Sequence, residues 1–185
     1  MRMTMIAAAA LLAVAPAAAQ TPVSVPAFDS LELRGGGHVT VRHGATQQVT
    51  LLRGNSETSR FSVDAQGKLR IDACRRSCRG YRLEVEIVTP ELEGAAISGG
   101  GVISAKGDFP DRGMLALAVT GGGVIDLVAI ESGSVAAAVR GGGAIRTHAR
   151  NSLLASINGG GSIAYLGDPR VTSAINGGGA VGPVE

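Results

Sequence analysis

Residues 155–163 read Ala-Ser-Ile-Asn-Gly-Gly-Gly-Ser-Ile, and the second half of the chain repeats this pattern. In each copy apolar residues alternate and are followed by one polar residue, three glycines, one small residue and then Ile or Val. The glycine runs of the second half begin at Gly99, Gly121, Gly141, Gly159 and Gly177, and an earlier run begins at Gly35. The steps between the five later runs are 22, 20, 18 and 18 residues. A repeat near 20 residues is typical of stacked units that bury their apolar side only against one another.

The alternation has a period of two, which predicts strands whose apolar side chains share one face. The glycines that follow predict a tight corner, because a sharp bend needs positive φ angles and stacked corners leave no room for side chains. The predicted corner residues are Gly99, Gly100, Gly101, Gly121, Gly122, Gly123, Gly141, Gly142, Gly143, Gly159, Gly160, Gly161, Gly177, Gly178 and Gly179.

These features predict an all-β fold, namely a right-handed parallel β-helix or β-solenoid with coils of about 18–22 residues. Residues 93–185 would hold the regular coils, and residues 21–92 would form more irregular coils with hairpin excursions. The candidate strands of the first half are Leu31–Arg34, His38–Arg42, Gln48–Arg53, Arg60–Asp64, Lys68–Asp72 and Tyr81–Val88. We expect one domain over residues 21–185. The competing interpretation is a separate antiparallel subdomain that caps the solenoid.

The first nineteen residues are typical of an export signal. Arg2 provides a short positive start, residues 5–14 are apolar and uncharged, and Ala17-Ala18-Ala19 is a small-residue cleavage site. The apolar stretch is short for a membrane span, and no later segment reaches the length that a span requires. We therefore predict a signal peptide at residues 1–19 and an exported protein, either periplasmic or secreted to the cell surface, with no integral membrane segment.

Cys74 and Cys78 are the two cysteines, and they lie four residues apart. In an oxidising compartment this spacing predicts a disulfide that closes a small loop. A local basic stretch surrounds them, for which we expect a solvated hairpin tip, and it consists of Arg75, Arg76, Arg79 and Arg82. The formal net charge of the whole chain is only +2, which argues against nucleic-acid binding.

The sequence offers little catalytic or metal-binding chemistry. Calcium-binding glycine repeats need an aspartate in each turn, whereas here Asp126 alone follows a glycine run at the matching position. The other acids of the regular coils do not recur at one register, and His38, His43 and His148 show no nucleophile–base spacing. We therefore expect no enzyme activity, no metal and no cofactor.

One polar residue precedes each later glycine run: Ser98, Thr120, Arg140, Asn158 and Asn176. Stacked coils would place these side chains in a ladder along one edge. Asparagine ladders stabilise stacked strands by hydrogen bonding along the stack, which is one interpretation. The other is a linear contact strip for a glycan or an extended peptide.

The layout from about Val23 to Val181 resembles a known bacterial family, the auto-transporter adhesin head domain or GIN domain. The segments that carry the resemblance are residues 35–42 (Gly-Gly-Gly-His-Val-Thr-Val-Arg), 67–71, 83–90, and the Ile-Ser/Asn-Gly-Gly-Gly copies at 97–101, 157–161 and 175–179. Family copies often read Ser-Gly-Ser-Gly-Asp, whereas this chain has three glycines and mostly no aspartate. The resemblance implies an exported β-helix-type envelope protein, and it brings no catalytic residues.

Two functional hypotheses follow. The first is a non-enzymatic exported cell-envelope binding protein, adhesin-like, whose partner is a glycan or protein of the envelope or surface. The second is a periplasmic structural or assembly module that pairs through the open end of the solenoid, also with further copies of itself. Pro183 and Glu185 lie at that end and would blunt it.

Overall fold

The computed structural model describes residues 20–74, 78 and 80–184, so the predicted signal peptide at residues 1–19 lies outside it. The described residues form strands joined by turns, without a helix. In chain order the strands are β1 (Thr21–Val23), β2 (Ser30–Gly35), β3 (His38–His43), β4 (Gln48–Arg53), β5 (Arg60–Val63), β6 (Lys68–Asp72), β7 (Glu84–Thr89), β8 (Gly94–Gly99), β9 (Val102–Lys106), β10 (Arg112–Gly121), β11 (Val124–Gly141), β12 (Ala144–Gly159), β13 (Ser162–Leu166), β14 (Arg170–Asn176) and β15 (Ala180–Pro183). They belong to one 15-stranded sheet.

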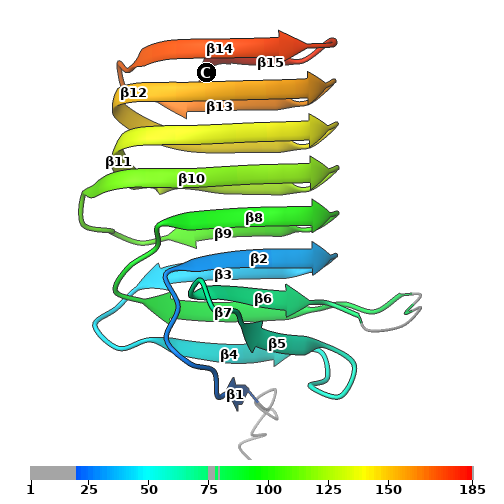
Figure 1. Ribbon diagram of the computed structural model, residues 1–185. Helices are drawn as coiled ribbons and strands as arrows, with labels where there is room; N and C mark the ends of the chain where they lie inside the picture. The colour runs from blue at the N-terminus through cyan, green and yellow to red at the C-terminus, as the bar shows by residue number, and fades with distance from the viewer. Residues whose placement is uncertain (1–19, 75–77, 79, 185) are drawn as a thin grey trace, which may run out of the picture.

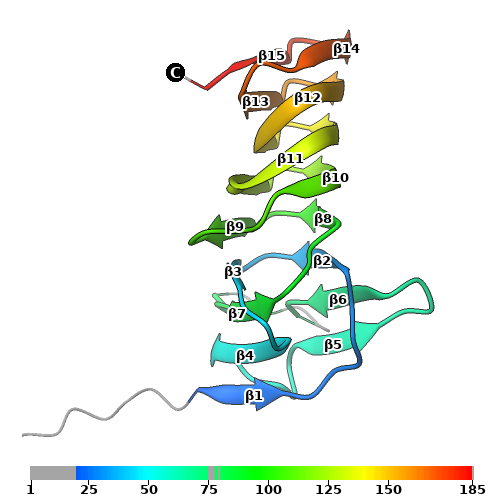
Figure 2. The same ribbon diagram turned by 90° about the vertical axis from the view of Figure 1, so that its left-hand side faces the viewer.

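The sheet is stacked in layers that form two facing walls (Figures 1 and 2). One wall contains β6, β2, β8, β10 and β14, and the other contains β4, β7, β3, β9, β13 and β15. Strands β11 and β12 belong to both walls, because each is long enough to pass from one to the other. The start of β11 pairs with β9, and its end pairs with β10. From β8 to β15 each layer of the stack is therefore one circuit of the chain.

The layers from β8 to β15 pair in parallel and in register. Equivalent positions of one wall are occupied by buried β-branched residues, which are Ile97, Val119, Val139 and Ile157. The opposite wall contributes Ile103, Ile125, Ile145 and Ile163 in the same manner. Because neighbouring strands lie about 4.8 Å apart, these residues form continuous apolar columns inside the stack.

The predicted fold class, a right-handed parallel β-helix, is wrong. Strands β1 and β7 pair antiparallel with β4, and β5 pairs antiparallel with β6, so the sheet is mixed. The order of neighbouring strands runs from β1 along one wall, across β11, and back along the other wall to β5. The sheet therefore closes almost completely around the core. The physical reason lies in turns such as the one at Gly67 (φ 74°), which reverse the chain into hairpins. Period-two alternation is the same in parallel and antiparallel strands, so the sequence pattern did not distinguish them.

One apolar core extends through the whole stack, from Phe28 to Ile163. Parallel pairing of β2 with β8 joins the N-terminal strands to the repeats. The two ends of the stack differ. At the N-terminal end the outermost strands are the antiparallel β1 and β5, and at the C-terminal end they are the parallel β14 and β15. Each of these four strands pairs with one described strand only.

Candidate binding surface

The three positions of each glycine run are not equivalent at the corner between the walls. Gly141, the first, has φ 116°, and a Cβ atom there would lie 2.7 Å from the carbonyl oxygen of Gly121 in the layer below. A Cβ atom on Gly143, the third, would overlap the side chain of Val119. Gly142, in the middle, has no heavy atom within 4 Å of such a Cβ and no left-handed φ. The structure therefore requires glycine at the first and third positions but not at the second.

The polar residues that precede the glycine runs lie in one row on the outer side of the first wall. The strand registers pair Ser98 with Thr120, Thr120 with Arg140, Arg140 with Asn158, and Asn158 with Asn176. We call these five residues the polar row. Arg34 of β2 continues the row below Ser98, because it is in register with that residue. The sequence signal for Arg34 was its position directly before the first glycine run, at Gly35.

Few hydrogen bonds hold the side chains of the polar row. Ser98 Oγ donates to Glu32 Oε1 over 3.2 Å. In the described part of the chain no hydrogen bond joins Asn158 to Asn176, and no carboxylate forms an ion pair with Arg140. The exposed amides and the guanidinium therefore keep their hydrogen-bonding capacity for another molecule.

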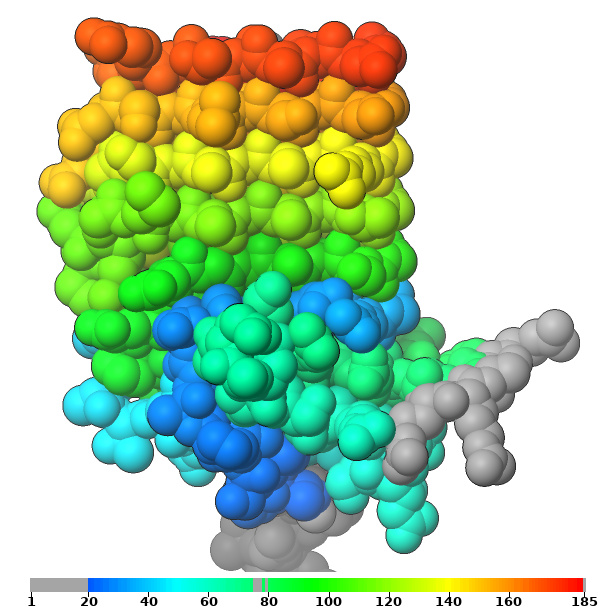
Figure 3. All heavy atoms as spheres, viewed as in Figure 1, coloured from blue at the N-terminus to red at the C-terminus, as the bar shows by residue number. Residues whose placement is uncertain are grey.

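Beside the polar row the outer side of the same wall is covered by small apolar side chains. Strand registers place these residues in adjacent rows, and we call the set the alanine wall: Ala96, Ala116, Ala118, Ala136, Ala138 and Leu154. Leu154 is 59% exposed, and Met114 at the border of the wall is 68% exposed. In Figure 3 the upper layers of this face are flat, with side chains in vertical columns. Flat apolar surfaces of this kind are typical of interaction sites.

All six residues of the alanine wall line a shallow hollow of about 510 Å³. Its floor is formed by the alanines, and charged side chains of Asp29, Lys68 and Glu93 lie at its N-terminal edge. Figure 3 shows the N-terminal segments projecting forward below the flat layers, which creates this ledge. The sequence did not predict this hollow. Its only signal was that alanines stand at outward positions of β10 and β11, where alternation normally places polar residues.

The outer side of the opposite wall is charged instead. Arg42 contacts Glu86 at 2.8 Å, and Arg146 contacts Asp126 at 2.9 Å, each pair linking two neighbouring strands. A third pair, Arg53 with Glu84 at 3.4 Å, lies on the same wall. Paired charges of this kind are ordinary solvated surface. Because of this contrast between the two walls, the alanine wall is the candidate binding surface.

A protein family matches most of this chain. The family described as "Putative auto-transporter adhesin, head GIN domain" matches residues 27–114 and 113–169. The chain belongs to the GIN domain family. No curated protein matches this GIN domain in sequence.

Three solved structures are similar to this GIN domain to different degrees. A putative adhesin from Bacteroides fragilis has 16% sequence identity and a TM-score of 0.56, with 90% of this chain and 96% of that chain covered. A putative adhesin from Parabacteroides distasonis has 18% identity and a TM-score of 0.41, with the same coverage. A putative cell adhesion protein from Clostridium sporogenes has 15% identity and a TM-score of 0.39, with 89% and 97% covered. At these identities the likeness to the Bacteroides protein shows a common fold.

Glu32 links the polar row of the GIN domain to its N-terminal layers. Arg34 Nε donates to Glu32 Oε1 at 2.8 Å, and the Ser98 hydroxyl donates to the same oxygen. Burial alone would raise the pKa of Glu32. The hydrogen bond and charge of Arg34, then Ser98 and the charge of Lys68, outweigh burial, so this pKa lies below its ordinary value.

The lowered pKa of Glu32 predicts an acid-sensitive contribution to stability. A carboxylate whose folded pKa is depressed stabilises the fold above its unfolded pKa, and the contribution disappears as the pH falls through the folded pKa. We expect Glu32→Gln to lower the free energy of unfolding by about 1 kcal/mol at neutral pH. This difference should shrink toward zero below about pH 4. Urea unfolding of both proteins across this pH range measures it, and a difference that stays constant would contradict the assignment.

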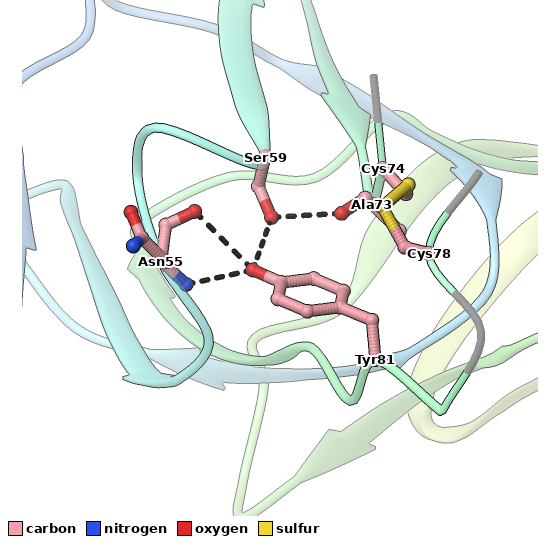
Figure 4. Close-up of a disulfide and its surroundings, with 6 residues drawn as sticks. All are labelled: Asn55, Ser59, Ala73, Cys74, Cys78 and Tyr81. Carbon is pink, nitrogen blue, oxygen red and sulfur yellow. Dashed lines mark hydrogen bonds between the residues drawn. A yellow bond between two sulfur atoms is a disulfide. The ribbon is translucent and has the colours of Figure 1, made fainter. Parts of the chain in front are cut away.

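The structure joins Cys74 and Cys78 in a disulfide, as the sequence predicted. The disulfide closes a loop at the end of β6 (Figure 4). Arg82 of the predicted basic tip is exposed. Three members of that tip lie outside the described residues: Arg75, Arg76 and Arg79.

Tyr81 fixes the base of this loop. Its hydroxyl accepts a hydrogen bond from the backbone N–H of Asn55 at 2.7 Å and lies 2.8 Å from the Ser59 hydroxyl. Ser59 Oγ in turn donates to the carbonyl oxygen of Ala73. Figure 4 shows these groups converging from three segments beside the disulfide. The cluster is a structural clamp, because each of its polar atoms is used within the fold.

Residues 20–74, 78 and 80–184 contain no group of three or more His, Cys, Asp or Glu side chains that could hold a metal ion. The same residues contain no helix with the length and apolarity that a membrane span requires.

Proposed function

We propose that this GIN domain is a non-enzymatic, exported binding protein of the cell envelope, adhesin-like, and that it contacts its partner through the alanine wall and the polar row. The observation that carries the proposal is the asymmetry of the two walls. One outer face bears paired charges in its layers, whereas the repeat layers of the other face present small apolar side chains beside unengaged amides and a guanidinium. The ion pairs of that second face, which Glu32 forms with Arg34 and Arg70, lie in its N-terminal layers. Membership of an adhesin-like family supports the same function and an exported or surface location.

The shape of the surface indicates the kind of partner. The polar row follows the stack axis, and its side chains recur once per layer, about 4.8 Å apart. An extended chain laid along the row could hydrogen-bond to Arg140, Asn158 and Asn176 in succession while its apolar side packs on the alanines. A linear glycan or an extended segment of an envelope protein has this form, and neither needs a metal or a cofactor.

Charge introduced on the alanine wall tests the proposal. Ala118 is exposed at the centre of the wall, so a glutamate there would place an unpaired carboxylate under any bound apolar surface. We expect Ala118→Glu to weaken binding at least tenfold, which corresponds to about 1.4 kcal/mol. The measurement is retention of the purified protein on immobilised linear glycans and envelope proteins.

Ala164→Glu is the matched control. Ala164 lies on the opposite wall, in register with Arg146, so it receives the same substitution on the charged face. Both variants should unfold at the temperature of the wild type, and only Ala118→Glu should lose retention. Equal retention of both variants, or no retention of the wild type, would contradict the proposal.

The exported location has its own test. Protease added to intact cells should cleave a tagged copy of the protein if the protein lies on the surface. Protection until the outer barrier is opened osmotically would place it in the periplasm. The partners to screen would then be periplasmic components. Protection in opened cells as well would contradict export.

A further inference from the structure

The C-terminal end of the stack exposes strand edges and the end of the apolar core. Figure 2 shows β14 and β15 at the top of the molecule with no strand beyond them. Among the described strands β14 pairs with β12 alone and β15 with β13 alone. Ile175, which occupies a core position, is 44% exposed, whereas its equivalents Ile157 and Val139 in the layers below are each 1% exposed. A free strand edge of this kind is a template for pairing with another chain.

The register shows which backbone groups of β14 face outward. Ala116 N–H donates to Glu93 O in the layer below, and Thr172 stands at the equivalent position of β14. Thr172 therefore points down toward β12. Backbone groups alternate sides along a strand, so the N–H and C=O groups of Val171, Ser173 and Ile175 point out of the stack.

The neighbouring strand β15 is less suited than β14 to pair with another chain. Ala180 N–H donates to Gly161 O and Val184 N–H donates to Tyr165 O, so these two residues also point down. Val181 and Pro183 point outward by the same alternation, and Pro183 has no N–H to donate. β14 is therefore the strand whose outer edge can form hydrogen bonds with a strand of another chain.

We propose that two copies of this protein associate end to end, with β14 of one copy antiparallel to β14 of the other and Ser173 on the two-fold axis. In this register Val171 pairs with Ile175 of the partner subunit, and Ser173 pairs with Ser173 of the partner subunit. All the outward-pointing residues then face one another, which is the geometry of hydrogen-bonded antiparallel pairs. The apolar pairs lie over the exposed end of the core.

The charges of β14 are compatible with this register. Arg170, its only charged residue, would lie opposite Asn176 of the partner subunit rather than opposite another arginine. Like charges directly opposite one another destabilise a strand pair, so their separation favours this arrangement. The association leaves the alanine wall exposed and goes beyond the proposed binding function.

The association ends at two copies. A growing filament would need an N-terminal end that accepts β14. In the part of the chain that the structure describes, the edges at that end are β1, with three residues including Pro22, and β5, with four. β14 has seven residues. Pairing the same edge of both copies closes the assembly by symmetry. One strand pair also covers less than the about 800 Å² per partner of a standard interface, so the dimer should exchange with monomer.

Cysteine cross-linking tests the register. Residues of a hydrogen-bonded antiparallel pair have Cα atoms about 5.5 Å apart, within the range of a disulfide. We expect Ser173→Cys to give a covalent dimer under mild oxidation. Asn176→Cys is the matched control, because in this register its two copies lie about 20 Å apart and cannot form a disulfide.

Sedimentation of the wild-type protein tests the stoichiometry. The average mass should rise with concentration from one copy toward two and stop there. A mass that stays at one copy, or that exceeds two, would overturn the proposal. So would equal cross-linking of the two cysteine variants, or no cross-linking of Ser173→Cys. Cross-linking and sedimentation do not depend on retention by a glycan or protein. Failure of the proposed binding function can therefore be distinguished from failure of the proposed dimer.

Discussion

Gly141→Ala should lower the free energy of unfolding by about 3 kcal/mol or more. The residue has φ 116°, which an alanine adopts only with strain, and the added methyl group would meet the carbonyl oxygen of Gly121 at 2.7 Å. That oxygen cannot move aside, because it accepts the hydrogen bond from Gly142 N–H that holds the two layers together at the corner. Strain and steric overlap therefore act on the same peptide group.

The neighbouring Gly142→Ala is the control for the same corner. Its added methyl group would find no heavy atom within 4 Å, and its φ lies outside the left-handed region. We expect a change within about 0.5 kcal/mol, which could be a slight stabilisation because alanine restricts the unfolded chain. Urea unfolding of the two variants measures the contrast. Equal losses would show that the corner tolerates no side chain at all.

Ile157→Ala should destabilise the protein by about 2–5 kcal/mol. Ile157 is 1% exposed between Val139 and Ile175 of an apolar column, so its truncation leaves a cavity between layers that are joined by backbone hydrogen bonds. The strands cannot approach one another to fill the space, because their separation is set by those bonds. Thermal unfolding of the variant measures the loss.

Leu154→Ala, on the same strand, gives the matched comparison. Leu154 points outward from the alanine wall and is 59% exposed, so its truncation should change stability by less than about 0.5 kcal/mol. A large loss of stability at this position would indicate that the wall is part of the fold rather than a surface kept free for a partner.

Strand positions were predictable from the sequence, whereas their pairing was not. The predicted strands Gln48–Arg53 and Lys68–Asp72 coincide with β4 and β6. The alternation that located them depends on burial of one face, which parallel and antiparallel partners provide equally. Pairing direction is decided by the connections, and the turn at Gly67 returns the chain as a hairpin rather than around the stack.

The candidate surface was predictable only where residues repeat. The polar row could be aligned because each member precedes a glycine run, and the strand registers place its members side by side. The alanine wall gave no such signal, since Ala116 or Ala138 alone fits either face of a strand. The hollow also depends on Lys68 and Asp29, which only the folding of the N-terminal hairpin brings against the repeats. The identity of the ligand could not be predicted either, because a flat surface of small side chains has no characteristic sequence motif.

The unpaired last layer makes local stability uneven along the molecule. An inner strand such as β11 is held from both sides, whereas β14 and β15 are held from one side only. The last layer can therefore fray while the layers beneath it stay intact, since opening it breaks one set of hydrogen bonds and exposes little additional core. At the opposite end β1 and β5 are likewise each held from one side only, by β4 and β6, so this end can open in the same way. The inner layers are therefore the most resistant part of the molecule, and opening starts from either end of the stack.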